Sequence, residues 1–164
     1  MRGENKMKNL IICSSKYGST EECAQLLKEE LIGQTNIVNL MNSKKLELSN
    51  YENVILGAPI YIGNIPKEMK KFVNENIDQL LSKNTGIFIL SGDNNESYLE
   101  KNYPTELLDQ AIIIKHFGAV LDIAKLSFIK RLVIKYIIRK ESHRSIREEN
   151  IKSFADKINV IFRL

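Results

Sequence analysis

Tryptophan is absent from this 164-residue chain, and cysteine is scarce. The two cysteines, Cys13 and Cys23, lack the spacing of a metal site or a redox pair, so we expect core thiols in a reduced cytoplasm. No apolar run approaches the roughly 20 residues that a membrane-spanning helix needs. The polar residues 1–6 contain no apolar segment of the kind a signal peptide carries. We therefore expect residues 1–6 to be a disordered lead-in or tag and residues 7–164 to form a single domain.

Several catalytic and nucleotide-binding motifs are also missing. The chain has neither the Gly-x-x-x-x-Gly-Lys-Ser/Thr loop of Walker proteins nor the Gly-x-Gly-x-x-Gly loop of dinucleotide-binding domains. Its two histidines, His116 and His143, lie away from any nucleophile motif, which disfavours a serine or cysteine hydrolase. A phospho-acceptor receiver domain needs acidic residues where this chain has Cys13-Ser14 and Ala58-Pro59. We expect both histidines to be structural or solvated and predict no catalytic acid or base.

Apolar runs alternate with helical patterns along the chain, and this alternation predicts an α/β fold. Right-handed crossovers between such units give a parallel sheet with helices on both faces. The best match is a doubly wound, five-stranded sheet of order 2-1-3-4-5, whose ligand crevice lies beyond the carboxyl ends of strands one and three. We expect strands at 8–13, 36–40, 53–58 and 86–90, and a fifth strand within 111–121, at 117–121. Helices are expected at 20–32, from 66 to 77, at 96–102, from 105, at 126–140 and at 147–161.

The loop after the first expected strand is the most informative part of the chain. It is rich in hydroxyl side chains and leads directly into a helix, whose first amides and positive dipole end favour an anion. We predict a phosphate site there; the alternative is that Ser19 or Thr20 only caps the helix. The predicted phosphate-binding residues are Ser15, Lys16, Tyr17, Gly18, Ser19 and Thr20.

This loop resembles the Ser/Thr-x-Thr-Gly-x-Thr loop of the flavodoxin family, which wraps the phosphate of flavin mononucleotide (FMN). Ser15, Gly18 and Thr20 match it, whereas Tyr17 replaces the middle threonine. The resemblance implies FMN as the cofactor and a flavodoxin-like sheet. Two further loops, after the third and fourth strands, would then flank the flavin ring. Their predicted ring-side residues are Pro59, Ile60, Tyr61, Ile62, Gly63, Asn64, Ser91, Gly92 and Asp93.

Two tyrosines are candidates for contact with the ring itself. Tyr61 follows Gly57 and Pro59 and precedes Gly63, as in the ring-binding loop of flavodoxin-like proteins, so it would stack on the isoalloxazine. The alternative for Tyr61 is an ordinary surface aromatic packed on its own loop. Tyr98 is a weaker candidate for the other ring face.

A basic, amphipathic stretch precedes the last expected helix, and the net charge of +4 contrasts with the acidic character of shuttle flavodoxins. One interpretation is an extra helix packed on the domain with a solvated charged face. The others are a surface for anionic lipid or for an acidic redox partner. The residues concerned are Lys130, Arg131, Lys135, Arg139 and Lys140.

With this stretch included, the chain is similar to the flavodoxin-like, menaquinone-dependent protoporphyrinogen oxidase family. That similarity implies an FMN oxidoreductase of haem biosynthesis that passes electrons from protoporphyrinogen to a quinone. Its location would be the cytoplasm or the inner face of the membrane. The alternative is a flavodoxin-type electron carrier without its own substrate, and a third hypothesis is a degenerate domain that has lost its flavin. In each case we expect no metal and no nucleic-acid partner.

Overall fold

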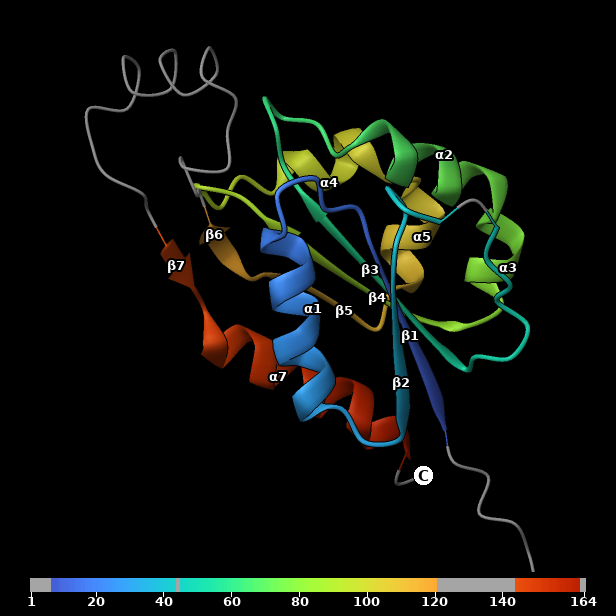
Figure 1. Cartoon of the computed structure of the whole chain (residues 1–164). Helices are drawn as coiled ribbons and strands as arrows, with labels where there is room; N and C mark the ends of the chain where they lie inside the picture. The colour runs from blue at the N-terminus through green and yellow to red at the C-terminus, as the bar shows by residue number, and fades with distance from the viewer. Residues whose placement is uncertain (1–6, 44, 121–143, 163–164) are drawn as a thin grey trace, which may run out of the picture.

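A computed structural model describes residues 7–43, 45–120 and 144–162 (Figure 1). Five strands form one parallel sheet in the order β2-β1-β3-β4-β5, which confirms the predicted fold class. The central strands are nearly continuous apolar runs because helices cover both of their faces. The strands are β1 (Lys8–Cys13), β2 (Gln34–Asn39), β3 (Asn53–Pro59), β4 (Asn84–Leu90) and β5 (Ile113–His116).

Helices cover the two faces of the sheet, and side chains from alternate strand positions reach them. Leu10 and Ile12 of β1 join one buried cluster, whereas Ile11 joins the other, as the two-residue period of a strand requires. The cluster with Ile11 lies under α1 (Ser19–Glu30) and α7 (Glu148–Phe162). The opposite face carries α2 (Lys67–Glu75), α3 (Ile77–Leu81), α4 (Ser97–Asn102) and α5 (Thr105–Gln110) (Figure 1).

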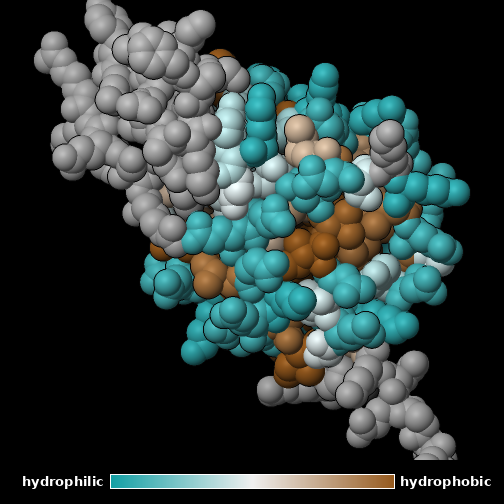
Figure 2. Space-filling view, viewed as in Figure 1, coloured by the Kyte–Doolittle hydropathy of each residue, from teal (hydrophilic) through white to brown (hydrophobic). Residues whose placement is uncertain are grey.

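The loops that follow β1, β3 and β4 gather at one edge of the sheet, in the upper left of Figure 1. Parallel strands bring their carboxyl ends to the same edge, so these three loops come together although they are far apart in sequence. In the same view, hydrophilic side chains cover most of the face, and hydrophobic ones surface near the edge strand β2 (Figure 2).

The fifth strand lies within the predicted range 111–121, but its expected position at 117–121 is wrong. β5 is Ile113–His116, and Gly118–Val120 forms β6, paired antiparallel with β7 (Arg144–Ile146). Gly118 has a φ of +96°, which interrupts the extended backbone after Phe117. The Phe117 ring is buried and stacks on Phe88 with ring centroids 4.4 Å apart. A core aromatic therefore produced the apolar pattern that suggested a strand.

The helix expected from 66 to 77 ends earlier than predicted. The helical backbone is interrupted at Asn76, which separates α2 from α3. The side-chain amide of Asn76 donates to the carbonyl of Phe72 at 2.8 Å and satisfies an acceptor at the end of α2. The extra helix expected at 126–140, with its five named basic residues, lies outside the described residues. Within those residues, each helix is too short or too polar to span a bilayer.

Both cysteines are buried, as predicted. Burial raises the pKa of the Cys13 thiol to about 12, and the nearby carboxylate of Glu21 acts in the same direction. Because the thiolate is the reactive form of cysteine, Cys13 is inert near neutral pH.

Candidate functional site

The loop between β1 and α1 turns sharply at Gly18 to start the helix. Gly18 has a φ of +88°, a left-handed conformation that glycine adopts without steric cost, and it is the N-cap residue of α1. Its amide donates to Ser15 Oγ at 3.1 Å, whereas no side chain caps the helix. The predicted alternative, a cap by Ser19 or Thr20, is therefore not what the geometry shows. The end of α1 stays available to an anion.

The hydroxyl of Thr20 is the most unusual polar group of this loop. Thr20 is completely buried, and its Oγ1 has no hydrogen-bond partner among the described residues. A buried hydroxyl without a partner costs about 1–3 kcal/mol by mutational measures. The position of this group at the start of α1 places a donor where an anion would satisfy it.

Asn39, at the end of β2, fixes the start of the loop. Its Oδ1 accepts from the amide of Ser15 at 3.1 Å, and its Nδ2 donates to the carbonyl of Ser15 at 2.9 Å. The same Nδ2 lies 3.2 Å from Glu21 Oε2. Sequence analysis missed Asn39, although its place beside Cys13 in the parallel register puts it at the carboxyl edge of the sheet.

The loop after β3 forms a tight turn that presents an aromatic side chain. Tyr61 and Asn64 exchange backbone hydrogen bonds of 2.8 and 3.0 Å, and the residues between them, Ile62 and Gly63, both have positive φ. Two central residues with positive φ characterise the type I′ turn of hairpins. Tyr61 is 43% exposed and Ile62 98% exposed. The turn therefore holds an apolar, accessible tip at the edge of the site.

A tyrosine pair joins the predicted phosphate loop to this turn. The rings of Tyr17 and Tyr61 meet edge to face, with centroids 6.4 Å apart and planes at 82°. Lys16 Nζ lies 5.6 Å from the centroid of the Tyr17 ring. Partial burial raises the pKa of Tyr61, with a smaller contribution from Tyr17, so the hydroxyl stays protonated at physiological pH.

The turn after β4 is tied to the rest of the site by side chains. Ser91 is buried, and its hydroxyl donates to the Asp93 carbonyl, while Gly92 and Asp93 are exposed. Tyr98 donates to Asp93 Oδ2 at 3.1 Å. A Cβ on Gly63 would lie 3.5 Å from the Tyr98 ring. Tyr98 therefore bridges the two ring-side turns.

Asn102 is a second positioning residue that sequence analysis missed. Its Nδ2 donates to the carbonyls of Gly63 and Tyr98, at 2.9 and 2.7 Å, and its Oδ1 accepts from the amide of Ile65 at 3.1 Å. All polar atoms of the side chain are thereby used. A lone asparagine in a short helix gives no sequence signal for such a role, because its partners are distant in the chain.

The predicted site residues therefore form three groups at one edge of the sheet. One end of the site consists of the hydroxyl groups of the Ser15–Thr20 loop and the N-terminus of α1. The other end consists of the Tyr61 turn, into which Pro59 and Ile60 lead, and the Ser91–Asp93 turn. The amide of Ile60 donates to the Leu90 carbonyl at 2.8 Å, which holds the two turns side by side. Such an arrangement suits a ligand with an anionic group at one end and a flat ring at the other. The described residues contain no group of His, Cys, Asp and Glu side chains able to hold a metal ion.

Known proteins match this chain in sequence. A family model described as a flavodoxin domain matches residues 10–146. The flavodoxin of Clostridium saccharobutylicum is 41% identical over 73 residues, which cover 42% of this chain and 46% of that protein. Protoporphyrinogen IX dehydrogenase (quinone) of Escherichia coli K12 is 33% identical over 79 residues, 46% of this chain and 44% of that protein. The matched part of the chain thus spans about half the length of these curated relatives.

Solved structures share the fold at low sequence identity. An archaeal flavodoxin has a TM-score of 0.55 and 14% identity, over 93% of this chain and 99% of that one. Oxidised flavodoxin 1 of Bacillus cereus has a TM-score of 0.57 and 16% identity, over 93% and 97% of the two chains. These likenesses concern the arrangement of the strands and helices.

Proposed function

The chain belongs to the flavodoxin domain family. We propose that it binds FMN at the three loops described above and carries electrons. The phosphate lies at the Ser15–Thr20 loop and the ring at the Tyr61 and Ser91–Asp93 turns. FMN supplies the electron-transfer chemistry when bound. The protein holds the cofactor in place and shields one part of it from water.

The buried, unpartnered hydroxyl of Thr20 is the observation that carries this proposal. It fits a phosphate because a phosphate oxygen accepts the hydrogen bond that the protein leaves unmade. Ser15 Oγ already accepts from Gly18, so its own proton is also left for an acceptor. The first amides of α1, which follow the left-handed Gly18 and have no side-chain cap, are further donors at the same helix end.

The aromatic side of the site would orient the ring. Tyr61 is exposed enough to receive a stacked partner, and its turn is fixed by the Asn64 bridge and by Asn102. Tyr17 contacts Tyr61 and adds a second aromatic surface on the phosphate side. Backbone groups of the two turns are the donors and acceptors that would set the flavin potential.

A titration with FMN tests the proposal. We expect the protein to quench FMN fluorescence on binding, and Thr20→Val to raise Kd about 10- to 100-fold, as loss of one hydrogen bond to a charged group predicts. The matched control is Thr35→Val, which removes a buried hydroxyl remote from the loop and should leave the Kd unchanged. Equal affinity of wild type and Thr20→Val would contradict the proposal.

A narrower function is favoured by the match to protoporphyrinogen IX dehydrogenase. In this version the FMN protein oxidises a porphyrinogen and reduces a quinone; in the flavodoxin version it passes electrons between protein partners only. Anaerobic mixing of the FMN-loaded protein with protoporphyrinogen and a menaquinone analogue separates the two. Porphyrin formation that requires both protein and quinone supports the narrower function, whereas turnover only with a flavodoxin reductase supports the carrier.

A further inference from the structure

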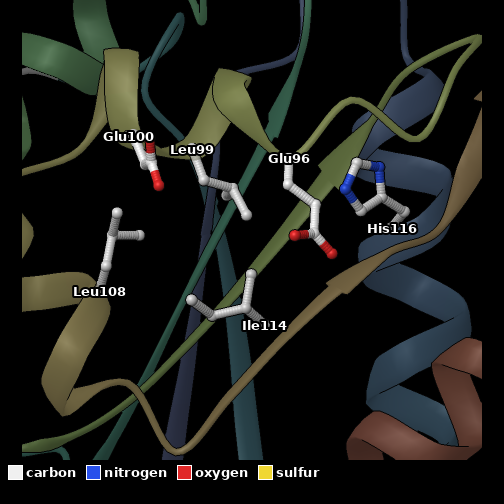
Figure 3. A pocket seen from close by; sticks show the side chains of 6 residues that line it. All are labelled: Glu96, Leu99, Glu100, Leu108, Ile114 and His116. Atoms are coloured by element: carbon white, nitrogen blue, oxygen red, sulfur yellow. The ribbon is translucent and has the colours of Figure 1, made fainter.

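A pocket lies beside the proposed flavin site, between the edge strand β5 and helices α4 and α5 (Figure 3). Its volume is about 300 Å³, at the small end of ligand pockets. One part of the lining is aliphatic, from Leu99, Leu108 and Ile114. The other part is polar, from Glu96, Glu100 and His116.

The hydrogen bonds of His116 determine what it offers to this pocket. The Ser91 hydroxyl donates to the Asp93 carbonyl, and Ser91 Oγ lies 3.2 Å from His116 Nδ1. Nε2 is buried and has no partner among the described residues. In Figure 3 the ring edge with Nε2 faces the pocket and the carboxylate of Glu96.

The charges of the pocket are of one sign. Glu96 and Glu100 are exposed, and neither belongs to the ion pair found among the described residues, Lys71–Glu75. Burial lowers the pKa of His116, and Arg147 lowers it further, so the imidazole is neutral at pH 7. Two of the three polar side chains of the lining are thus negatively charged, and the third is neutral.

We propose that this pocket binds a small organic cation, an amine with an aromatic or aliphatic body. The apolar body packs against the aliphatic side chains, and the ammonium group lies between the two glutamates, beside the neutral ring of His116. A ligand of the opposite sign is disfavoured, because a carboxylate there would face two carboxylates. The pocket shares none of its lining residues with the proposed flavin site, although His116 contacts Ser91 of that site.

Tryptamine and indole-3-acetate are suitable probes, since they share an indole ring but carry opposite charges. The chain has two histidines, so a His143→Gln variant leaves a single imidazole for NMR. We expect tryptamine to shift the His116 signals saturably and indole-3-acetate to leave them in place at the same concentration. The experiment is repeated with FMN in excess, so that stacking of indole at the flavin site does not affect the result.

Substitutions identify the groups that bind the ammonium. Glu96→Gln and Glu100→Gln should each raise the Kd for tryptamine about two- to fivefold, as expected for partly exposed charges. Glu106→Gln removes an exposed carboxylate of α5 outside the lining and should have no effect. Equal binding of the two indoles, or unchanged affinity of the Glu96→Gln/Glu100→Gln double variant, would overturn the proposal. Loss of FMN binding with tryptamine binding intact would count against the flavin site alone.

Discussion

Asn39 holds the backbone of Ser15 through both of its polar atoms, accepting from the amide at 3.1 Å and donating to the carbonyl at 2.9 Å. The side chain of Asn39, from the neighbouring strand β2, thereby binds both the amide and the carbonyl of Ser15. Because β1 and β2 are parallel, Asn39 lies beside Cys13, the last residue before the loop. The loop geometry at Ser15 is therefore set by the edge of the sheet.

We expect Asn39→Ala to lower the affinity for FMN about 30-fold, because two loop hydrogen bonds worth about 1 kcal/mol each, or about 2 kcal/mol together, are lost. Isothermal titration of the apoprotein with FMN measures the change. The control is Asn36→Ala on the same strand, whose side chain donates to the Tyr51 hydroxyl at 2.8 Å, away from the loop. If both alanine variants bind FMN as the wild type does, Asn39 has no part in positioning the loop.

Two buried threonines give opposite predictions for the free energy of unfolding without FMN. Thr20 Oγ1 lacks a partner among the described residues, whereas Thr85 Oγ1 donates to the Leu80 carbonyl at 2.9 Å. Thr20→Val should therefore stabilise the apoprotein by about 1 kcal/mol, and Thr85→Val should destabilise it by about 1–2 kcal/mol. Urea unfolding measures both changes. A destabilised Thr20→Val apoprotein would show that the hydroxyl has a partner in solution.

Of the residues in the two predictions above, the sequence alone identifies Thr20 but not Asn39. The loop with Thr20 was visible because hydroxyl residues and a glycine stand between a strand pattern and a helix pattern. Asn39 was not, since its partner Ser15 is 24 residues away and pairing of β1 with β2 had to be known first. The position of β5 was misjudged for a related reason. Phe117 packs on Phe88 in the core, and although its amide still donates to the Ile89 carbonyl of β4 at 2.9 Å, the backbone turns at Gly118. The fold class needed only periodicity, while these contacts depend on the assembled sheet.

Gly118 and Gly92 should differ sharply in their tolerance of a methyl group. A Cβ on Gly118 would lie 1.8 Å from the carbonyl oxygen of Ser145, and the residue has a φ of +96°. A Cβ on Gly92 would meet no atom within 4 Å. We expect Gly118→Ala to destabilise the protein by about 2 kcal/mol or more and Gly92→Ala to change stability by less than about 0.5 kcal/mol. Thermal unfolding measured by circular dichroism tests the pair, and equal melting temperatures would contradict the hairpin geometry.

His116 should make stability depend on pH. Burial and Arg147 lower its pKa from the ordinary value of 6.5, partly offset by Glu96 and Asp93. Because the pKa of His116 is lower in the folded protein, the unfolded chain binds the proton first as pH falls. The contribution of His116 to the free energy of unfolding is therefore complete above the ordinary pKa of 6.5 and is lost as pH falls below it. Between about pH 7 and pH 5, the free energy of unfolding should fall more steeply in the wild type than in His116→Asn. Parallel curves from urea titrations at each pH would argue against a lowered pKa.

Ile62 occupies a backbone conformation that suits it poorly. Its φ is +50°, a region that β-branched residues rarely adopt, and its side chain is 98% exposed, so it gains little by packing. Asparagine followed by glycine is the preferred pair at the centre of a type I′ turn, and Gly63 already provides the glycine. We therefore expect Ile62→Asn to stabilise the protein by about 1 kcal/mol, measured by urea unfolding.

The control for this change is Ile62→Val, which retains the β-branch and the strain and should leave stability unchanged. Because Asn64 Nδ2 donates to the Ile62 carbonyl at 2.9 Å, the turn itself does not depend on the Ile62 side chain. A stabilised Ile62→Asn variant that also transfers electrons more slowly to a partner protein would mean that the exposed isoleucine serves contact with that partner. If Ile62→Asn and Ile62→Val are equally stable, the turn is not strained at this residue.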